Sequence, residues 1–144
     1  MADPIQTAQD CFAQGFNCSQ AVFSAYAPQL GIDADTALKL ASPFGGGVAH
    51  RGDVCGAVTG ALLALGLKRG NATIDKKDET YQVAEEFLKR FQERHGTILC
   101  RELIGHDIST PDGLQNAREQ LVFKSVCPGL VMDAAELVSE FLDE

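Results

Sequence analysis

The sequence predicts an all-α protein, a single compact bundle of about seven or eight helices that spans residues 1–144. Apolar residues recur at helical spacing in several segments, as at Ile5, Ala8 and Phe12 near the N-terminus. Capping residues or prolines precede these segments, and glycines follow them. Strand signals are weak, and no repeat or low-complexity linker divides the chain, so we expect one helical domain.

The first three helices are predicted to be short. Each begins at a side chain that can accept a hydrogen bond from the first helical turn, and each ends near a proline or glycine. The expected ranges run from Asp3-Pro4 to Gly15, from Asn17 to Pro28, and from Asp33 or Asp35 to Pro43, where the glycine triplet 45–47 follows.

The segment Val54–Leu67 is the most unusual, because Gly56, Gly60 and Ala64 share one helical face. A glycine inside a helix costs about 1 kcal/mol relative to alanine, so two on one face indicate that another backbone packs closely there. We expect a central helix that starts at Gly52-Asp53. It is too short to cross a membrane, which needs roughly 20 apolar residues.

The longest predicted helix is Asp75–His95, whose outer face is rich in Glu, Lys and Arg as a solvated face should be. Gly96 ends it, and Thr97 is expected to cap a following helix that carries Cys100. Three further elements are expected: a loop over Gly105–Gly113, a short helix over Leu114–Phe123, and a final helix after Cys127-Pro128-Gly129.

Charge and targeting signals narrow the functional class. The formal net charge is −8, with a sequence pI near 4.8, and a surface this acidic repels nucleic acid. The N-terminus has no basic segment followed by an apolar run, so we expect no signal peptide and a cytoplasmic, non-membrane protein. In that reducing compartment, five cysteines indicate metal-binding or catalytic thiols more often than structural disulfides.

Four of the five cysteines are candidate site residues, for catalysis or as metal ligands. Cys18, Cys55 and Cys127 fall at predicted helix N-termini, where the helix dipole can lower a thiol pKa from about 8.5 to about 3.5–7.5. We therefore expect these three to share a site with Cys100. Cys11 lies beside an apolar stripe and is interpreted as a core residue. The cysteine spacing matches no short zinc motif.

The glycine-rich segment before Cys55 has two interpretations. Glycines let a backbone approach a cofactor or substrate closely, which makes five residues candidates for cofactor binding: Gly46, His50, Arg51, Gly56 and Gly60. Alternatively, the segment is a flexible connection between two helices. It is not a nucleotide-binding loop, because GxGxxG and GxxxxGK[ST] are both absent. His95 and His106 are interpreted as surface residues.

The segments Gly15–Val22 and Cys55–Ala61, followed by two lone cysteines, resemble the C_GCAxxG_C_C family of redox-active proteins. The resemblance covers essentially the whole chain. It maps the family's four cysteines onto Cys18, Cys55, Cys100 and Cys127, and its CGAxxG motif onto Cys55, Gly56, Ala57 and Gly60. Cys11 is outside the pattern. The resemblance implies redox chemistry without naming a substrate or a cofactor.

Three functions remain open at this stage. The leading one is thiol–disulfide exchange or electron transfer with a redox partner protein or a small thiol, with Cys55 as the first candidate nucleophile because His50 and Arg51 are near it in sequence. The second is a module in which four thiolates bind zinc or an iron–sulfur cluster. The third is a non-catalytic helical binding module. The oligomeric state is open, with a homodimer among the alternatives.

Overall fold

The computed structural model describes residues 3–144, and within that range the all-α class is confirmed, with no strand and one isolated bridge between Val54 and Leu99. Eight α-helices of five or more residues occur there, together with the one-turn helix α8. The α-helices are α1 (Pro4–Ala13), α2 (Cys18–Tyr26), α3 (Ala34–Ala41), α4 (Gly56–Arg69), α5 (Lys77–His95), α6 (Cys100–Ile104), α7 (Pro111–Glu119), α8 (Val122–Ser125) and α9 (Cys127–Asp143). Short 3₁₀ turns cover Ala27–Leu30, Ser42–Phe44 and Ile74–Lys76.

The first three predicted helix starts are confirmed by their caps. Asp3 accepts a hydrogen bond from the backbone of Ile5 at 3.0 Å, and Asp33 accepts one from Thr36 at 2.9 Å. Asn17 forms a reciprocal capping box with Gln20 at the start of α2. The N-terminal segment, in which no signal peptide was expected, begins with Met1 and Ala2. These two residues lie outside the described part of the chain.

Other boundaries differ from the sequence prediction. The central helix begins at Gly56 and not at Gly52, because the preceding residues form a tight left-handed turn. Leu99, and not Thr97, occupies the N-cap of α6, while the Thr97 hydroxyl accepts from the Leu99 backbone. Two helices replace the one expected over Leu114–Phe123. α7 begins before the expected start because Thr110 caps it, and Leu121 separates α7 from α8 with a left-handed φ of 58°.

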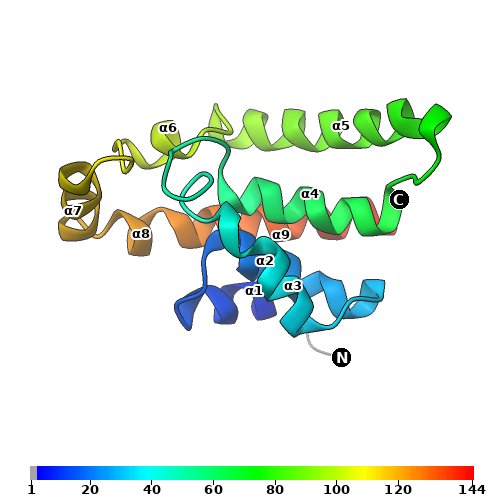
Figure 1. The fold of residues 1–144 in the computed structure, drawn as a ribbon, viewed down its shortest axis with the longest axis horizontal. Coiled ribbons are helices and arrows are strands. Elements are labelled where there is room, and N and C mark those ends of the chain that lie inside the picture. Colours follow the sequence, from blue (N-terminus) through cyan, green and yellow to red (C-terminus); the bar gives the residue numbers. More distant parts are fainter. Residues whose placement is uncertain (1–2) are drawn as a thin grey trace.

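The helices are arranged in layers about α4 and α9. α5 lies along one side of this pair and α1–α3 lie on the other, while α6, α7 and α8 gather at one end (Figure 1). The core is built from aromatic and small apolar side chains, among them Phe23, Phe87, Phe91 and Phe141. A smaller cluster at the α6–α8 end contains Cys100, Cys127 and Ile108. Within residues 3–144, no helix combines the length and the apolar character that crossing a membrane requires.

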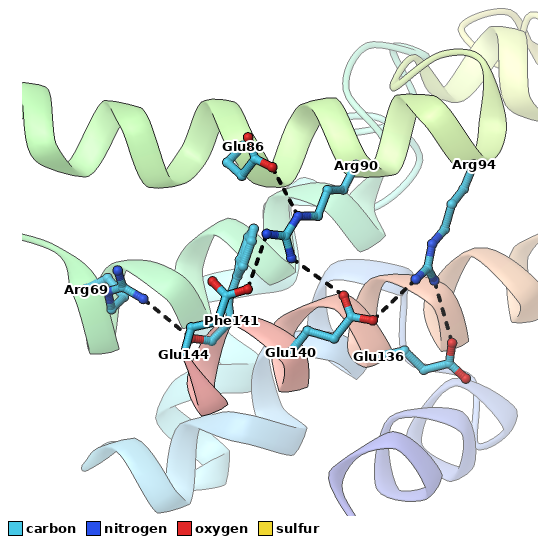
Figure 2. Close-up of polar contacts among 8 residues, drawn as sticks. All are labelled: Arg69, Glu86, Arg90, Arg94, Glu136, Glu140, Phe141 and Glu144. Carbon is cyan, nitrogen blue, oxygen red and sulfur yellow. Dashed lines mark hydrogen bonds and ion pairs between the residues drawn. The ribbon is translucent and has the colours of Figure 1, made fainter.

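A charged seam joins α5 to α9. Arg90 lies 3.2 Å from Glu86, 3.7 Å from Glu140 and 3.2 Å from Glu144, and its guanidinium stacks on the Phe141 ring at 4.4 Å (Figure 2). One helical turn later, Arg94 lies 3.6 Å from Glu136 and 3.5 Å from Glu140. The seam thus pairs much of the basic charge of α5 with carboxylates of α9.

Replacing Arg90 with glutamine is expected to lower the free energy of unfolding by about 1–2 kcal/mol, since it removes a stacked cation shared by three carboxylates. Urea titrations of both proteins should show this difference, and it should shrink in high salt because the ion pairs are partly exposed. Lys89→Gln, an exposed neighbour with no ion-pair partner in the described residues, is the matched control. Equal losses for the two variants would contradict the prediction.

His95 is less exposed than the sequence analysis expected. Its side chain is 19% exposed, its ring lies 4.6 Å from that of Phe91, and its Nε2 lies 2.8 Å from a carboxylate oxygen of Asp133 on α9. His106 is also partly buried, with its Nδ1 2.9 Å from the Ile104 carbonyl oxygen. Neither histidine lines the cysteine cavity described next.

Candidate functional site

A cavity of about 500 Å³ lies where α2, α4, α6 and α9 begin. Cys18, Cys55, Cys100 and Cys127 all line it, although they are spread over most of the sequence. Cys11 is outside the lining; it packs against the main core, with its sulfur 3.7 Å from the Ser24 hydroxyl. The structure therefore brings the four candidate cysteines together and separates the fifth from them.

Each of the four cysteines stands at the start of a helix. Cys18, Cys100 and Cys127 are the first residues of α2, α6 and α9, and Cys55 is the N-cap residue of α4. Sequence reasoning placed three of them in this way and missed Cys100, because Thr97 was the better capping side chain in its neighbourhood. The cavity is thus a point at which four helix N-termini converge.

The glycine face of α4 positions Cys18 against the start of that helix. A Cβ atom on Gly60 would lie 2.5 Å from the Ser19 carbonyl oxygen, and one on Gly56 would lie 3.2 Å from the Cβ of Cys18. The Ser19 and Thr59 hydroxyls also hydrogen-bond at 3.2 Å. The close helix contact predicted from the glycine spacing is therefore present, and it is a contact with the first turn of α2.

Backbone hydrogen bonds place Cys100 beside Cys55. The Cys55 amide donates to the Ile98 carbonyl at 2.8 Å, and the Cys100 amide donates to the Asp53 carbonyl at 2.6 Å. The bridge between Val54 and Leu99 lies between these two bonds. The residues before α4 and α6 therefore run side by side, and the two thiols are held at neighbouring helix starts.

The segment before Cys55 forms a left-handed turn that is closed by backbone hydrogen bonds. Five consecutive residues, 46–50, have φ angles between 51° and 68°, and three of them, Val48, Ala49 and His50, are not glycine. Left-handed geometry costs roughly 1–2 kcal/mol for each non-glycine residue. Hydrogen bonds offset this cost, including one from Gly52 to Gly46 and one from Asp53 to Gly47. Strained backbone of this kind tends to occur at functional sites.

Three of the five cofactor-binding candidates line the cavity, and two do not. Gly46, His50 and Gly56 are part of its wall. Gly60 instead faces the backbone of Ser19. The Arg51 side chain is 75% exposed, and its Nε lies 3.5 Å from Asp53, so its charge is directed to that carboxylate rather than to Cys55.

Burial raises the pKa of Cys55 to about 11 and that of Cys100 to about 12. For Cys55, hydrogen bonds from the Ala57 and Val58 amides at the start of α4 act in the opposite direction without cancelling the burial. The start of α4 thus lowers the pKa of Cys55 less than burial raises it, so the reason for favouring Cys55 as nucleophile does not hold. Near neutral pH both side chains are protonated thiols.

Cys18 and Cys127 influence each other's protonation. The interaction with Cys18 lowers the pKa of Cys127 below the ordinary thiol value, although burial opposes it. The interaction with Cys127 raises the pKa of Cys18, together with burial and the other cysteine charges. The pair therefore holds one proton on Cys18 and favours the thiolate on Cys127. Of the four cavity cysteines, Cys127 is the one whose pKa is lowered.

The cavity cysteines do not form a ready metal site. In the described part of the chain, no group of three or more Cys, His, Asp or Glu side chains is positioned to hold a metal ion. A structural zinc or a cluster held by four cysteines needs all four thiolates to converge on it.

Comparison with protein families agrees with this grouping. A family model described as "Putative redox-active protein (C_GCAxxG_C_C)" matches residues 16–141, which is most of the chain. The chain belongs to this family. No curated protein and no solved structure matches it.

Membership in the C_GCAxxG_C_C family supports the importance of the cavity cysteines. The match includes all four of them, along with the Cys55–Gly60 segment, and leaves out Cys11. In this chain the two glycines of that segment are the residues that allow α4 to approach Cys18 and Ser19. In this chain the motif therefore helps to assemble the cavity.

Cys127 is expected to be the first cavity cysteine to react with iodoacetamide, since the thiolate is the reactive form. Its reaction should extend to lower pH than that of a free thiol, because its pKa is lowered. Replacing Cys18 with alanine removes the interaction that lowers the pKa of Cys127 and should slow the reaction, most clearly at the acidic end of the pH range. Mass spectrometry after timed pulses between about pH 6 and pH 9 would measure both effects.

Cys11→Ala is the matched control, because Cys11 lies outside the cavity and should leave the reaction of Cys127 unchanged. Modification of Cys55 before Cys127 would show that the assignment of the thiolate is wrong and would restore the nucleophile first favoured from the sequence.

Proposed function

We propose that the protein carries out thiol–disulfide exchange, with Cys127 as the attacking thiolate and Cys18 as the resolving thiol. The observation that carries this proposal is the interaction between the two thiols, which favours deprotonation of Cys127 over that of Cys18. Both side chains also line one cavity, so a small substrate can reach them together.

The reaction transfers two electrons to a disulfide substrate. The Cys127 thiolate attacks one substrate sulfur, a mixed disulfide forms, and the other substrate half leaves as a thiolate. Cys18 then loses its proton and attacks Cys127, which releases the second half. The protein gains a Cys18–Cys127 disulfide, and the substrate becomes two thiols after protonation. Two molecules of a small thiol, or one dithiol of a redox partner protein, return the pair to the reduced form and are themselves oxidised to a disulfide.

This proposal places the protein in the cytoplasm, where thiol pools can keep the pair reduced between turnovers. Cys55 and Cys100 are assigned no covalent step, because burial keeps both protonated. The sequence favoured Cys55 as the nucleophile, whereas this proposal assigns that role to Cys127. The assignment changes because burial raises the pKa of Cys55.

Oxidation of the purified protein with diamide tests the proposal. Peptide mapping without reduction should find a Cys18–Cys127 disulfide, and Cys11→Ser should form the same bond in the same yield. A bond between Cys55 and Cys100 would overturn the assigned pair, and the absence of any bond among the four would overturn the function. Metal analysis of protein prepared without oxygen tests the metal-binding alternative. A stoichiometric metal would favour the metal-binding module.

A further inference from the structure

The charges that line the cysteine cavity are opposite in sign to those of the protein as a whole. The chain has 20 acidic and 12 basic residues, which give a net charge of −8. In the described residues, the cavity lining contains Arg118 and Lys124 and no aspartate or glutamate. An acidic protein therefore presents a locally basic cavity around its four thiols.

The two cations reach the cavity from adjacent helices next to Cys127. Arg118 lies in the last turn of α7, and Lys124 lies on α8, the one-turn helix that leads into α9. Both side chains are exposed. They stand at the solvent side of a cavity whose deeper wall contains the buried Cys55, Cys100 and Cys127.

Neither cation is neutralised by the protein itself. In residues 3–144, neither Arg118 nor Lys124 has a carboxylate within 4.0 Å, and neither side chain makes a hydrogen bond. The other five arginines behave differently: Arg51, Arg90, Arg94 and Arg101 pair with carboxylates, and Arg69 donates to the Phe141 carbonyl at 3.4 Å. An unpaired arginine and an unpaired lysine at one opening are a ready site for an anion.

The rest of the lining limits the size and character of a ligand. Apolar side chains form much of the wall, including Phe12, Phe16, Ile104, Leu114 and Phe123. A volume of about 500 Å³ is in the range of small-molecule sites, which are mostly apolar with a few polar groups that fix orientation. This composition matches a small organic molecule with an anionic end better than a folded protein partner.

We propose that the substrate is a small organic disulfide that carries a carboxylate, and that Arg118 and Lys124 bind this carboxylate while its sulfur reaches Cys127. This inference rests on the function proposed above and adds the class of substrate. The covalent steps are unchanged: Cys127 attacks the disulfide, a carboxylate-bearing thiol leaves, and Cys18 releases the second one.

A matched series of three small disulfides tests this inference. Dithiodipropionate is anionic, hydroxyethyl disulfide is neutral, and cystamine is cationic, and all three have the disulfide between two-carbon arms. The rate at which each forms the Cys18–Cys127 bond is divided by its rate with dithiothreitol, which removes differences in intrinsic reactivity. Dithiodipropionate should exceed hydroxyethyl disulfide by about tenfold, the factor for one charge-assisted hydrogen bond, and cystamine should be slowest.

Variants of the two cations assign the preference to the cavity. The double variant R118Q/K124Q should lose the advantage of dithiodipropionate and keep its rate with hydroxyethyl disulfide. R118E/K124E should prefer cystamine. Lys89→Gln, an exposed lysine on α5 outside the cavity lining, should retain the wild-type order. Because Arg118 and Lys124 are exposed, circular dichroism should show that all of these proteins remain folded.

The outcomes separate this inference from the function on which it rests. Equal normalised rates for the three disulfides, or a preference that survives in R118Q/K124Q, would overturn carboxylate recognition and leave thiol–disulfide exchange intact. Faster reaction with cystamine in the wild type would show that the overall charge of −8 governs access. Failure of all three disulfides to form the Cys18–Cys127 bond would overturn the proposed function, and the inference with it.

Discussion

Replacing Gly60 with leucine is expected to lower the free energy of unfolding by about 3 kcal/mol or more, at the upper end of the range for overpacked sites. A Cβ atom at this position would already lie 2.5 Å from the Ser19 carbonyl oxygen and 3.0 Å from the Ser19 Cα. Both atoms belong to the backbone of α2, so the helices must separate to admit any side chain. Thermal and urea unfolding monitored by circular dichroism would measure the loss.

Gly66 provides the matched control on the same helix. It is exposed, and a Cβ there would have no neighbour within 4 Å, so Gly66→Ala should raise stability by up to about 1 kcal/mol through helix propensity. Opposite signs for the two substitutions would separate close packing from propensity. A Gly60→Leu protein that unfolds at the wild-type temperature would show that α2 and α4 do not approach closely.

The sequence predicted the helical class and several features that shape the candidate site, because the relevant signals are local. Helical spacing, the caps at Asp3, Asn17 and Asp33, and the glycine face of α4 each depend on residues within a few turns of one another. The convergence of the four cysteines is not local. It was expected from helix starts and from the resemblance to the family, and the chain paths that produce it are visible only in the fold.

Two features of the site could not be deduced from the sequence. The first is the left-handed turn at 46–50: glycines predict freedom at 45–47, but nothing local indicates that Val48, Ala49 and His50 also adopt positive φ angles. Their backbone amides donate hydrogen bonds to the carbonyl groups of residues 43–45, which hold this conformation.

The second feature is the balance between burial and the helix dipole. A helix start predicts a lowered thiol pKa, and Cys55 occupies such a position, yet burial raises its pKa to about 11. How deeply a thiol is buried decides whether its pKa rises or falls, and the spacing of residues along the sequence does not show this depth. The pKa of Cys127 is lowered instead, because Cys127 interacts with Cys18, which lies more than one hundred residues away in the sequence.

The left-handed turn also yields the second large expected effect. Gly47 has a φ of 68°, and a Cβ there would lie 2.6 Å from the Asp53 amide nitrogen and 2.7 Å from the Cβ of Cys100. Gly47→Ala should therefore lower the free energy of unfolding by about 2–4 kcal/mol, from backbone strain and overpacking together. Gly105→Ala is the control: its φ of 71° is nearly the same, with no neighbour within 4 Å, so only the strain of about 1–2 kcal/mol should remain.

The difference between these two alanine variants measures how tightly the turn is packed against Cys100, and a second measurement connects it to the site. Because the alanine methyl group must displace either the Asp53 amide or Cys100, Gly47→Ala should expose the Cys100 thiol and accelerate its alkylation in the native protein. Gly105→Ala should not. If both variants lose the same stability and Cys100 stays protected in each, the turn serves only as a connection, and the positions of Cys55 and Cys100 depend on the Val54–Leu99 pairing alone.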